Sequence, residues 1–136
     1  MHSLLDHVGL EVSDLARSRA FYAAALEPLG IELVIEADGW AGFGPAGTPP
    51  EGLQHTPSFW IGARSSSKPA AITSAHVAFA SRDRASVEAF WQAATGQGGR
   101  DNGAPGIRAQ YHPSYFAAFV LDPDGHNVEA VCHAPA

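Results

Sequence analysis

The sequence contains two copies of one pattern, and this repeat constrains the fold more than any other feature. The segments "DHVGLEVSDLARSRAFYAAAL" (6–26) and "AHVAFASRDRASVEAFWQAAT" (75–95) each contain a His-Val pair, an apolar strand, a Ser/Asp helix start and two adjacent aromatic residues. His7 aligns with His76 at a separation of 69 positions. Self-similarity of this kind indicates two copies of one supersecondary unit.

Each copy opens with a strand of alternating polarity and continues with a helix. Because side chains alternate between the two faces of a strand, both histidines are predicted on the face opposite the apolar residues. A Ser or Asp cap begins each helix, and the apolar positions that follow include Phe21 and Tyr22 in the first and Phe90 and Trp91 in the second. These positions form the predicted core.

Further strands are predicted after each helix, and each half is assigned the order β-α-β-β-β. In the first half the strands are predicted at 31–37, 40–45 and 57–62. In the second half two weak strands, 97–101 and 107–111, precede a hairpin whose end is "LDPDGHNVEAVCH" (121–133). The predicted modules are residues 1–62 and 73–136, and the Ser- and Ala-rich segment 63–72 is the predicted linker.

The Asp-Pro-Asp-Gly turn determines the register of the last hairpin. These residues suit a type I turn followed by a left-handed residue, here Gly125. The resulting register places Phe119 opposite Glu129 and Tyr115 opposite His133. A carboxylate in the middle of an apolar strand therefore points to the same face as the two histidines.

Composition favours a small molecule as the main partner. Hydrophobic residues make up 46% and charged residues 16% of 136 residues, which is typical of an ordered globular protein. A formal charge of −6, without any run of Lys or Arg, argues against nucleic acid or an anionic membrane surface. The single cysteine, the lack of a signal-peptide pattern and the lack of a long apolar stretch favour a cytoplasmic protein that does not span a membrane.

The segments "DHVGLEVSDLARSRAFY", "AHVAF" and "FVLDPDGHNVEAV" together resemble the vicinal oxygen chelate superfamily. This superfamily includes glyoxalase I, extradiol dioxygenases, and fosfomycin- and bleomycin-resistance proteins. The resemblance covers nearly the whole chain. It implies an α+β fold in which two β-α-β-β-β modules form a curved eight-stranded mixed sheet around a cavity, with the helices on the outer face. It also implies a homodimer, and in some members two chains complete each cavity.

The resemblance further implies a divalent metal site. Carried over by position, the ligands are His7, His76 and Glu129. The fourth ligand position of glyoxalase-like members falls on Trp60, whose side chain cannot ligate a metal. Two histidines and one carboxylate suit Fe(II) or Mn(II), and Zn(II) and Ni(II) also accept such ligands. The resemblance therefore favours a dioxygenase-like metalloenzyme over a true glyoxalase I.

Other residues are assigned to the same predicted cavity. His112 and Tyr115 are candidates for an acid/base role near the metal, and Trp60 and Phe119 are predicted to line the cavity. A fosfomycin-resistance activity is disfavoured because Gly9 stands where those proteins carry threonine. The alternative is a metal-free binding protein of the bleomycin-resistance type, in which the aromatic lining holds a small ligand and the polar residues pair with one another.

The remaining histidines and the cysteine are expected outside the metal site. His126 in the turn and His55 in a Gly/Pro-rich loop are expected to be solvated. His133 lies four residues along the strand from Glu129, about 13 Å at the usual rise, and is expected at the rim. Cys132 is expected on the helix side as a small core residue.

Overall fold

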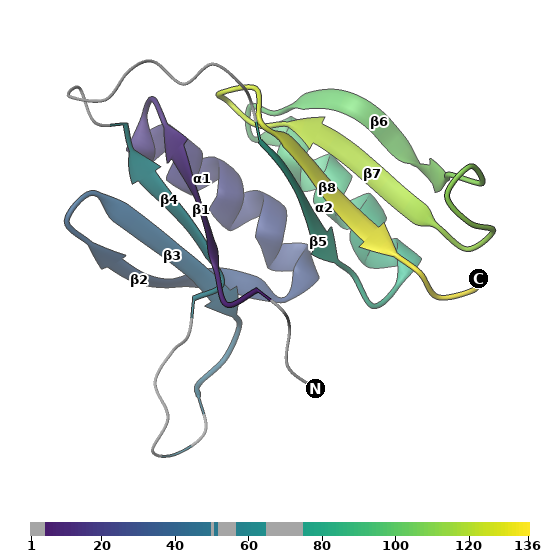
Figure 1. The fold of residues 1–136 in the computed structure, drawn as a ribbon, viewed down its shortest axis with the longest axis horizontal. Coiled ribbons are helices and arrows are strands. Elements are labelled where there is room, and N and C mark those ends of the chain that lie inside the picture. Colours follow the sequence, from purple (N-terminus) through teal and green to yellow (C-terminus); the bar gives the residue numbers. More distant parts are fainter. Residues whose placement is uncertain (1–4, 50, 52–56, 65–74) are drawn as a thin grey trace.

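The computed structural model describes residues 5–49, 51, 57–64 and 75–136, which form two β-α-β-β-β modules (Figure 1). The first comprises β1 (Val8–Val12), α1 (Leu15–Leu26), the 3-10 helix η1 (Glu27–Leu29), β2 (Ile31–Ala37), β3 (Trp40–Pro45) and β4 (Phe59–Ala63). The second comprises β5 (His76–Ala80), α2 (Arg84–Gly96), β6 (Arg100–Ile107), β7 (Phe116–Leu121) and β8 (Asn127–Cys132). The predicted α+β class and its repeated unit are confirmed.

The strands of each module form a four-stranded mixed sheet with the same topology. The strand orders are β1-β4-β3-β2 and β5-β8-β7-β6. β1 is parallel to β4 and β5 is parallel to β8, whereas the other neighbours are antiparallel. In the described part of the chain the eight strands do not close into a barrel. The two sheets lie side by side with both helices behind them in Figure 1, so that the opposite sheet faces are open.

The core lies between the sheets and the helices. Phe21 and Tyr22 of α1 and Phe90 of α2 are fully buried, which confirms the predicted apolar stripes. The Tyr22 ring packs against Phe59 of β4 with 4.9 Å between ring centroids. Cys132 is also buried, as predicted for the helix side of its strand. Burying each large apolar side chain contributes about 1.5–3 kcal/mol to folding.

An aspartate caps each helix. The Asp14 Oδ1 atom accepts a hydrogen bond from the Arg17 N–H at 3.1 Å, and Asp83 Oδ1 accepts one from the Ser86 N–H at 2.7 Å. Each cap satisfies a backbone donor that has no partner within the first turn of the helix. The two helix starts are thus a local consequence of the sequence, and Asp rather than Ser provides the cap in both.

The second half differs from the prediction between its helix and its hairpin. One strand, Arg100–Ile107, replaces the two weak strands predicted at 97–101 and 107–111. Its pairing with β7 is interrupted by two register shifts, one on each side of Gly103. Cross-strand pairing therefore overrides the Gly- and Pro-rich local sequence, which by itself disfavours a continuous strand. In the first half, β4 begins at Phe59, two residues later than predicted.

The Asp122–His126 turn joins the second module to the first. The Tyr22 hydroxyl of α1 donates to Asp122 Oδ2 at 2.5 Å, and the other oxygen of this carboxylate accepts from two backbone N–H groups of the turn. The Ser13 hydroxyl and backbone N–H both donate to Asp124 Oδ1, at 2.5 and 3.1 Å. The turn is therefore a docking element as well as a hairpin connection.

His126 takes part in the same contact between modules, so the expectation that it is solvated was wrong. Its Nδ1 atom accepts from the Ala75 N–H at 2.9 Å, and its Nε2 atom lies 3.1 Å from the Glu11 carbonyl oxygen. Because Nδ1 is the acceptor, Nε2 is the ring nitrogen that donates to the Glu11 carbonyl oxygen. His126 is thus held between the start of β5 in its own module and β1 of the other module.

Some predictions fall outside the described residues. The predicted linker, 63–72, lies mostly there, so the module boundaries stay a prediction, and His55 lies there as well. Within the described residues, no helix has the length and apolar character needed to cross a membrane.

Candidate functional site

His76 and Glu129 are the centre of the candidate site, on the open face of the second module. Parallel pairing of β5 with β8 places Ala78 beside Glu129, and His76 points to the same face two residues earlier. The His76 Nε2 atom lies 3.1 Å from Glu129 Oε1. The His76 side chain is 48% exposed, whereas the Glu129 side chain is 3% exposed. A nearly buried carboxylate therefore lies beside a histidine that is half exposed to solvent.

Tyr115 binds the second oxygen of Glu129. Its hydroxyl donates to Glu129 Oε2 at 2.5 Å. The predicted register of the hairpin is confirmed, because Phe119 pairs with Glu129 across β7 and β8. Burial, and then the hydrogen bond to Glu129 and its charge, raise the pKa of Tyr115 to about 12. The hydroxyl therefore keeps its proton and acts as a donor throughout the neutral range.

His112 and His133 form the rim of this site. The His112 Nε2 atom lies 2.8 Å from His133 Nδ1. The Tyr115 ring contacts both imidazoles, with centroid distances of 5.5 Å to His112 and 5.2 Å to His133. His133 is exposed, as expected for a rim position. Tyr115 thus lies between the histidine pair and Glu129.

Phe119 and Arg108 extend the site along the sheet. The Phe119 ring stacks on the His76 imidazole, with 6.2 Å between centroids and 23° between planes. The Arg108 guanidinium lies over Phe119, 5.3 Å from its centroid. Arg108 could not be identified from the sequence as a site residue, because it lies in a Gly- and Pro-rich stretch without a clear pattern. The pairing of β6 with β7 brings it over the Phe119 ring.

His7 lies apart from this group. It precedes β1 in the first module, its side chain is 59% exposed, and its Nδ1 atom lies 2.6 Å from Asp6 Oδ1. In Figure 1, β1 begins at the lower edge near the N-terminus, whereas β5 begins at the upper edge. No group of three His, Cys, Asp or Glu side chains within the described residues could hold a metal ion. One chain therefore brings together two of the three predicted ligands.

The His76–Glu129 pair is consistent with two positions of a metal site. Bonds of about 2.0–2.2 Å from nitrogen and oxygen donors place neighbouring donor atoms roughly 3 Å apart around a shared ion. The observed separation of 3.1 Å matches that geometry. Two protein ligands are fewer than a facial set of two histidines and one carboxylate requires, so a third donor is needed.

Trp60 contributes to the open face of the first module, together with Trp40. A Cβ atom at Gly42 would lie 2.9 Å from the Trp60 ring, and one at Gly62 would lie 2.5 Å from the Trp40 ring. Both indoles therefore lie directly over glycines of the sheet. They form an apolar floor in the first module, whereas the other predicted lining residue, Phe119, belongs to the second.

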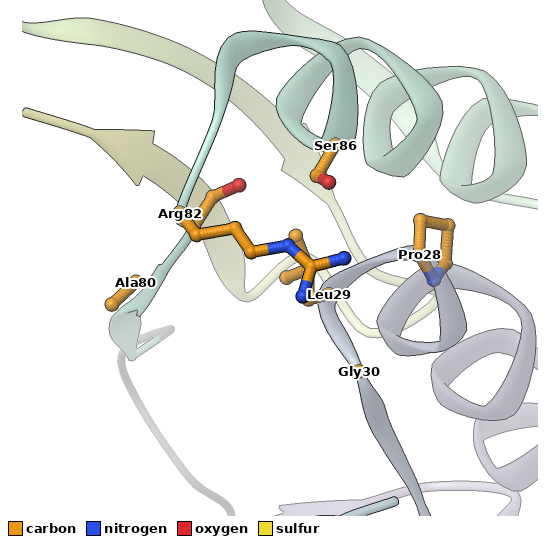
Figure 2. A pocket seen from close by; sticks show the side chains of 7 residues that line it. Pro28, Leu29, Gly30, Ala80, Arg82 and Ser86 are labelled. Atoms are coloured by element: carbon orange, nitrogen blue, oxygen red, sulfur yellow. The ribbon is translucent and has the colours of Figure 1, made fainter. Parts of the chain in front are cut away.

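A separate hollow of about 400 Å³ lies where η1 meets the start of α2 (Figure 2). Its lining residues are Pro28, Leu29, Gly30, Ala80, Ser81, Arg82 and Ser86. None of the predicted ligand or acid/base residues is among them. The Arg82 side chain, which Figure 2 shows extending across the hollow, is 91% exposed and lies 3.6 Å from Asp83. The open face around Glu129 is therefore the better candidate site.

The chain is similar to known proteins over nearly its full length. The family model described as Glyoxalase/Bleomycin resistance protein/Dioxygenase superfamily matches residues 4–130. A glyoxalase/bleomycin resistance protein from Albidiferax ferrireducens T118 is 27% identical, with a TM-score of 0.76, over 98% of this chain and 100% of that chain. No curated protein matches significantly.

A maize enzyme shows the same fold in a longer chain. Glyoxalase I from Zea mays is 27% identical with a TM-score of 0.66, over 94% of this chain and 45% of the maize chain. A family enzyme from Burkholderia phytofirmans PsJN, 17% identical with a TM-score of 0.68, agrees in fold. With the match of the family model, these findings show that the chain belongs to the glyoxalase/bleomycin resistance protein/dioxygenase superfamily.

Proposed function

We propose that the protein is a small-molecule metalloenzyme of the glyoxalase/dioxygenase type. The ligands of its divalent ion are His76 and Glu129 of one chain and His7 of the partner subunit. The observation that carries the proposal is the nearly buried Glu129 carboxylate with His76 Nε2 at 3.1 Å. A buried carboxylate costs several kcal/mol unless it is well compensated. Tyr115 compensates one oxygen of Glu129 by a hydrogen bond, and an ion shared with His76 would compensate the other.

Two observations support a homodimer that completes the site. His7 is exposed and lies outside the His76–Glu129 group. The first module also exposes large apolar side chains, and these are Leu5, Val8, Ile35 and Trp40. Exposed apolar surface of this kind is typical of protein interfaces. A second copy that covered the first module would bring a donor from one chain toward the carboxylate of the other.

The ligand set and the position of Trp60 favour a dioxygenase-like activity over glyoxalase I. Two histidines and one carboxylate suit Fe(II) or Mn(II), and also accept Zn(II) or Ni(II). Such an ion, when bound, stabilises negative charge on the vicinal oxygens of a substrate. Tyr115 orients the Glu129 carboxylate and holds a proton on its hydroxyl. His112, which contacts the Tyr115 ring at the rim, is the second candidate for an acid/base role.

A metal-free binding protein of the bleomycin-resistance type is the second candidate. The observation that favours it is that both oxygens of Glu129 already have partners, His76 and Tyr115. The carboxylate is then satisfied by hydrogen bonds alone. In this alternative an aromatic ligand binds against Trp60, Tyr115 and Phe119, and the two modules of different chains form its cavity.

Metal content tests the proposal. Wild-type protein, His76→Ala and the rim control His133→Ala are purified without a metal-binding tag, reconstituted with Fe(II), Mn(II), Zn(II) or Ni(II), and measured by elemental analysis. We expect one equivalent per chain in the wild type and in His133→Ala, and none in His76→Ala. Equal loss in both variants would contradict the assigned ligands, and no metal in the wild type would favour the binding protein.

Complementation tests the shared site. We expect His7→Ala to lose metal like His76→Ala. Subunit exchange between these two variants should restore metal binding, because each mixed dimer contains one site with an intact His7, His76 and Glu129. If mixing restores nothing while His7→Ala alone still binds metal, the ligands come from one chain and the shared site is wrong.

A further inference from the structure

Arg108 is held in a fixed position on the open face of the second module. Its Nη1 atom donates to the Gly106 carbonyl oxygen and its Nη2 atom to the Ala104 carbonyl oxygen, both at 2.8 Å. The Phe119 ring supports the guanidinium from below at 5.3 Å. Two hydrogen bonds and a stacking contact fix the plane of the side chain, so that little rotamer freedom remains to be lost on binding a ligand.

The charge of Arg108 has no carboxylate partner within 4 Å among the described residues. Three other arginines are paired: Arg17 with Asp124, Arg19 with Glu36, and Arg82 with Asp83. The protein has a formal charge of −6. Arg84 likewise has no such pair among the described residues and lies over the Phe116 ring at 5.1 Å. Arg108 differs from it in its position beside the candidate site, where its two side-chain hydrogen bonds go to neutral carbonyl groups. The nearest charge effect is on Asp101, whose pKa is lowered first by its hydrogen bonds to Gly103 and Trp91 and to a lesser extent by Arg108.

The position of this cation relates it to the candidate site. Phe119 lies beneath Arg108, and the same ring stacks on His76, whose Nε2 atom contacts Glu129. The guanidinium is thus one aromatic ring away from the proposed metal pair. Arginine is well suited to this role because its planar fork binds a carboxylate through two parallel hydrogen bonds.

We infer that Arg108 binds an anionic group of the substrate and so determines the substrate class. The substrate is then a small compound that carries a carboxylate next to the vicinal oxygens presented to the metal. This inference rests on the proposed function in one respect, namely that the vicinal oxygens of the substrate bind the proposed metal ion. Arg108 acts in it as a specificity-determining residue that contacts the substrate but takes no part in bond making.

A purely structural role makes a different prediction. If Arg108 only holds the chain between Ala104 and Gly106 in place, its replacement will disturb the whole site. It will then weaken neutral and anionic ligands alike. An anion anchor will instead affect only the ligand that carries the charge, and this difference separates the two roles.

The test compares two ligands that differ by one carboxylate. Catechol and 3,4-dihydroxybenzoate are titrated by calorimetry under nitrogen into Mn(II)-reconstituted wild type, Arg108→Gln and Arg100→Gln. The last is a matched control, because Arg100 is an exposed arginine at the start of β6, the strand that ends one residue before Arg108. We expect the wild type to prefer 3,4-dihydroxybenzoate by about 10- to 100-fold, the effect of a charge-assisted hydrogen-bond pair. Arg108→Gln should lose this preference with catechol affinity unchanged, and Arg100→Gln should keep it.

Three results would overturn the inference: no preference in the wild type, an unchanged preference in Arg108→Gln, or equal weakening of both ligands in that variant. Lack of measurable binding of 3,4-dihydroxybenzoate counts as no preference. Repeating the titrations in metal-free protein separates this inference from the proposed function. A preference that persists without metal and disappears in Arg108→Gln would support the anion anchor even if the metalloenzyme proposal fails.

Discussion

The hydrogen bond between Tyr22 and Asp122 should contribute strongly to stability, and Tyr22→Phe tests this. Tyr22 is fully buried in α1, and Asp122 in the turn of the other module is 3% exposed. Burial, and then the charge of Asp122, raise the pKa of the Tyr22 hydroxyl far above its usual value. The hydroxyl therefore keeps its proton and donates to the Asp122 carboxylate in the neutral range.

The expected magnitude follows from the burial of this contact. A hydrogen bond to a charged group contributes about 1.5–3 kcal/mol. Phenylalanine fills nearly the same space, so the packing of the ring against Phe59 is kept. Asp122 retains two backbone donors on its other oxygen but loses the Tyr22 hydroxyl as the donor to Oδ2. We expect Tyr22→Phe to lower the free energy of unfolding by about 2–3 kcal/mol.

Urea unfolding measures this loss, and Tyr111→Phe is the matched control. The control makes the same chemical change at a residue that is 62% exposed, and its effect should be near zero. The midpoint should shift in Tyr22→Phe while the denaturant slope stays constant. A loss below about 0.5 kcal/mol would refute the reasoning, because changes of that size are typical of surface sites without such a contact.

Two further predictions concern the sheet faces and pH. In Gly62→Ala the new Cβ atom would lie 2.5 Å from the Trp40 ring. We therefore expect a shifted tryptophan emission and a free energy of unfolding that is lower by about 1–3 kcal/mol. The control Gly96→Ala, whose Cβ would have nothing within 4 Å, should change this free energy little. Because burial and Glu129 raise the pKa of Tyr115 to about 12 from 10.0, the folded state holds this proton more tightly than the unfolded chain. Stability should therefore be complete below about pH 10 and decrease toward pH 12, and urea unfolding should show a shallower decrease in Tyr115→Phe.

The sequence by itself determined the repeat, the strand and helix that begin each module, and the register of the last hairpin. These features are local: the aspartate caps act within one helical turn, the apolar spacing acts along one helix, and the turn with Gly125 in the left-handed region (φ 87°) aligns the strands beside it. The prediction that Glu129 and His76 share a face also depends only on alternation along two strands. The structure confirms that these side chains meet.

Only the tertiary structure decided how the modules meet and what surrounds Glu129. The bulged pairing of β6 with β7 places Arg108 over Phe119, and the packing of the modules puts His126 between Ala75 and Glu11. It also sets His7 apart from the His76–Glu129 pair. Such contacts join residues far apart in the chain, and their partners are chosen by burial and by the pairing of whole strands. No pattern of neighbouring residues carries that information.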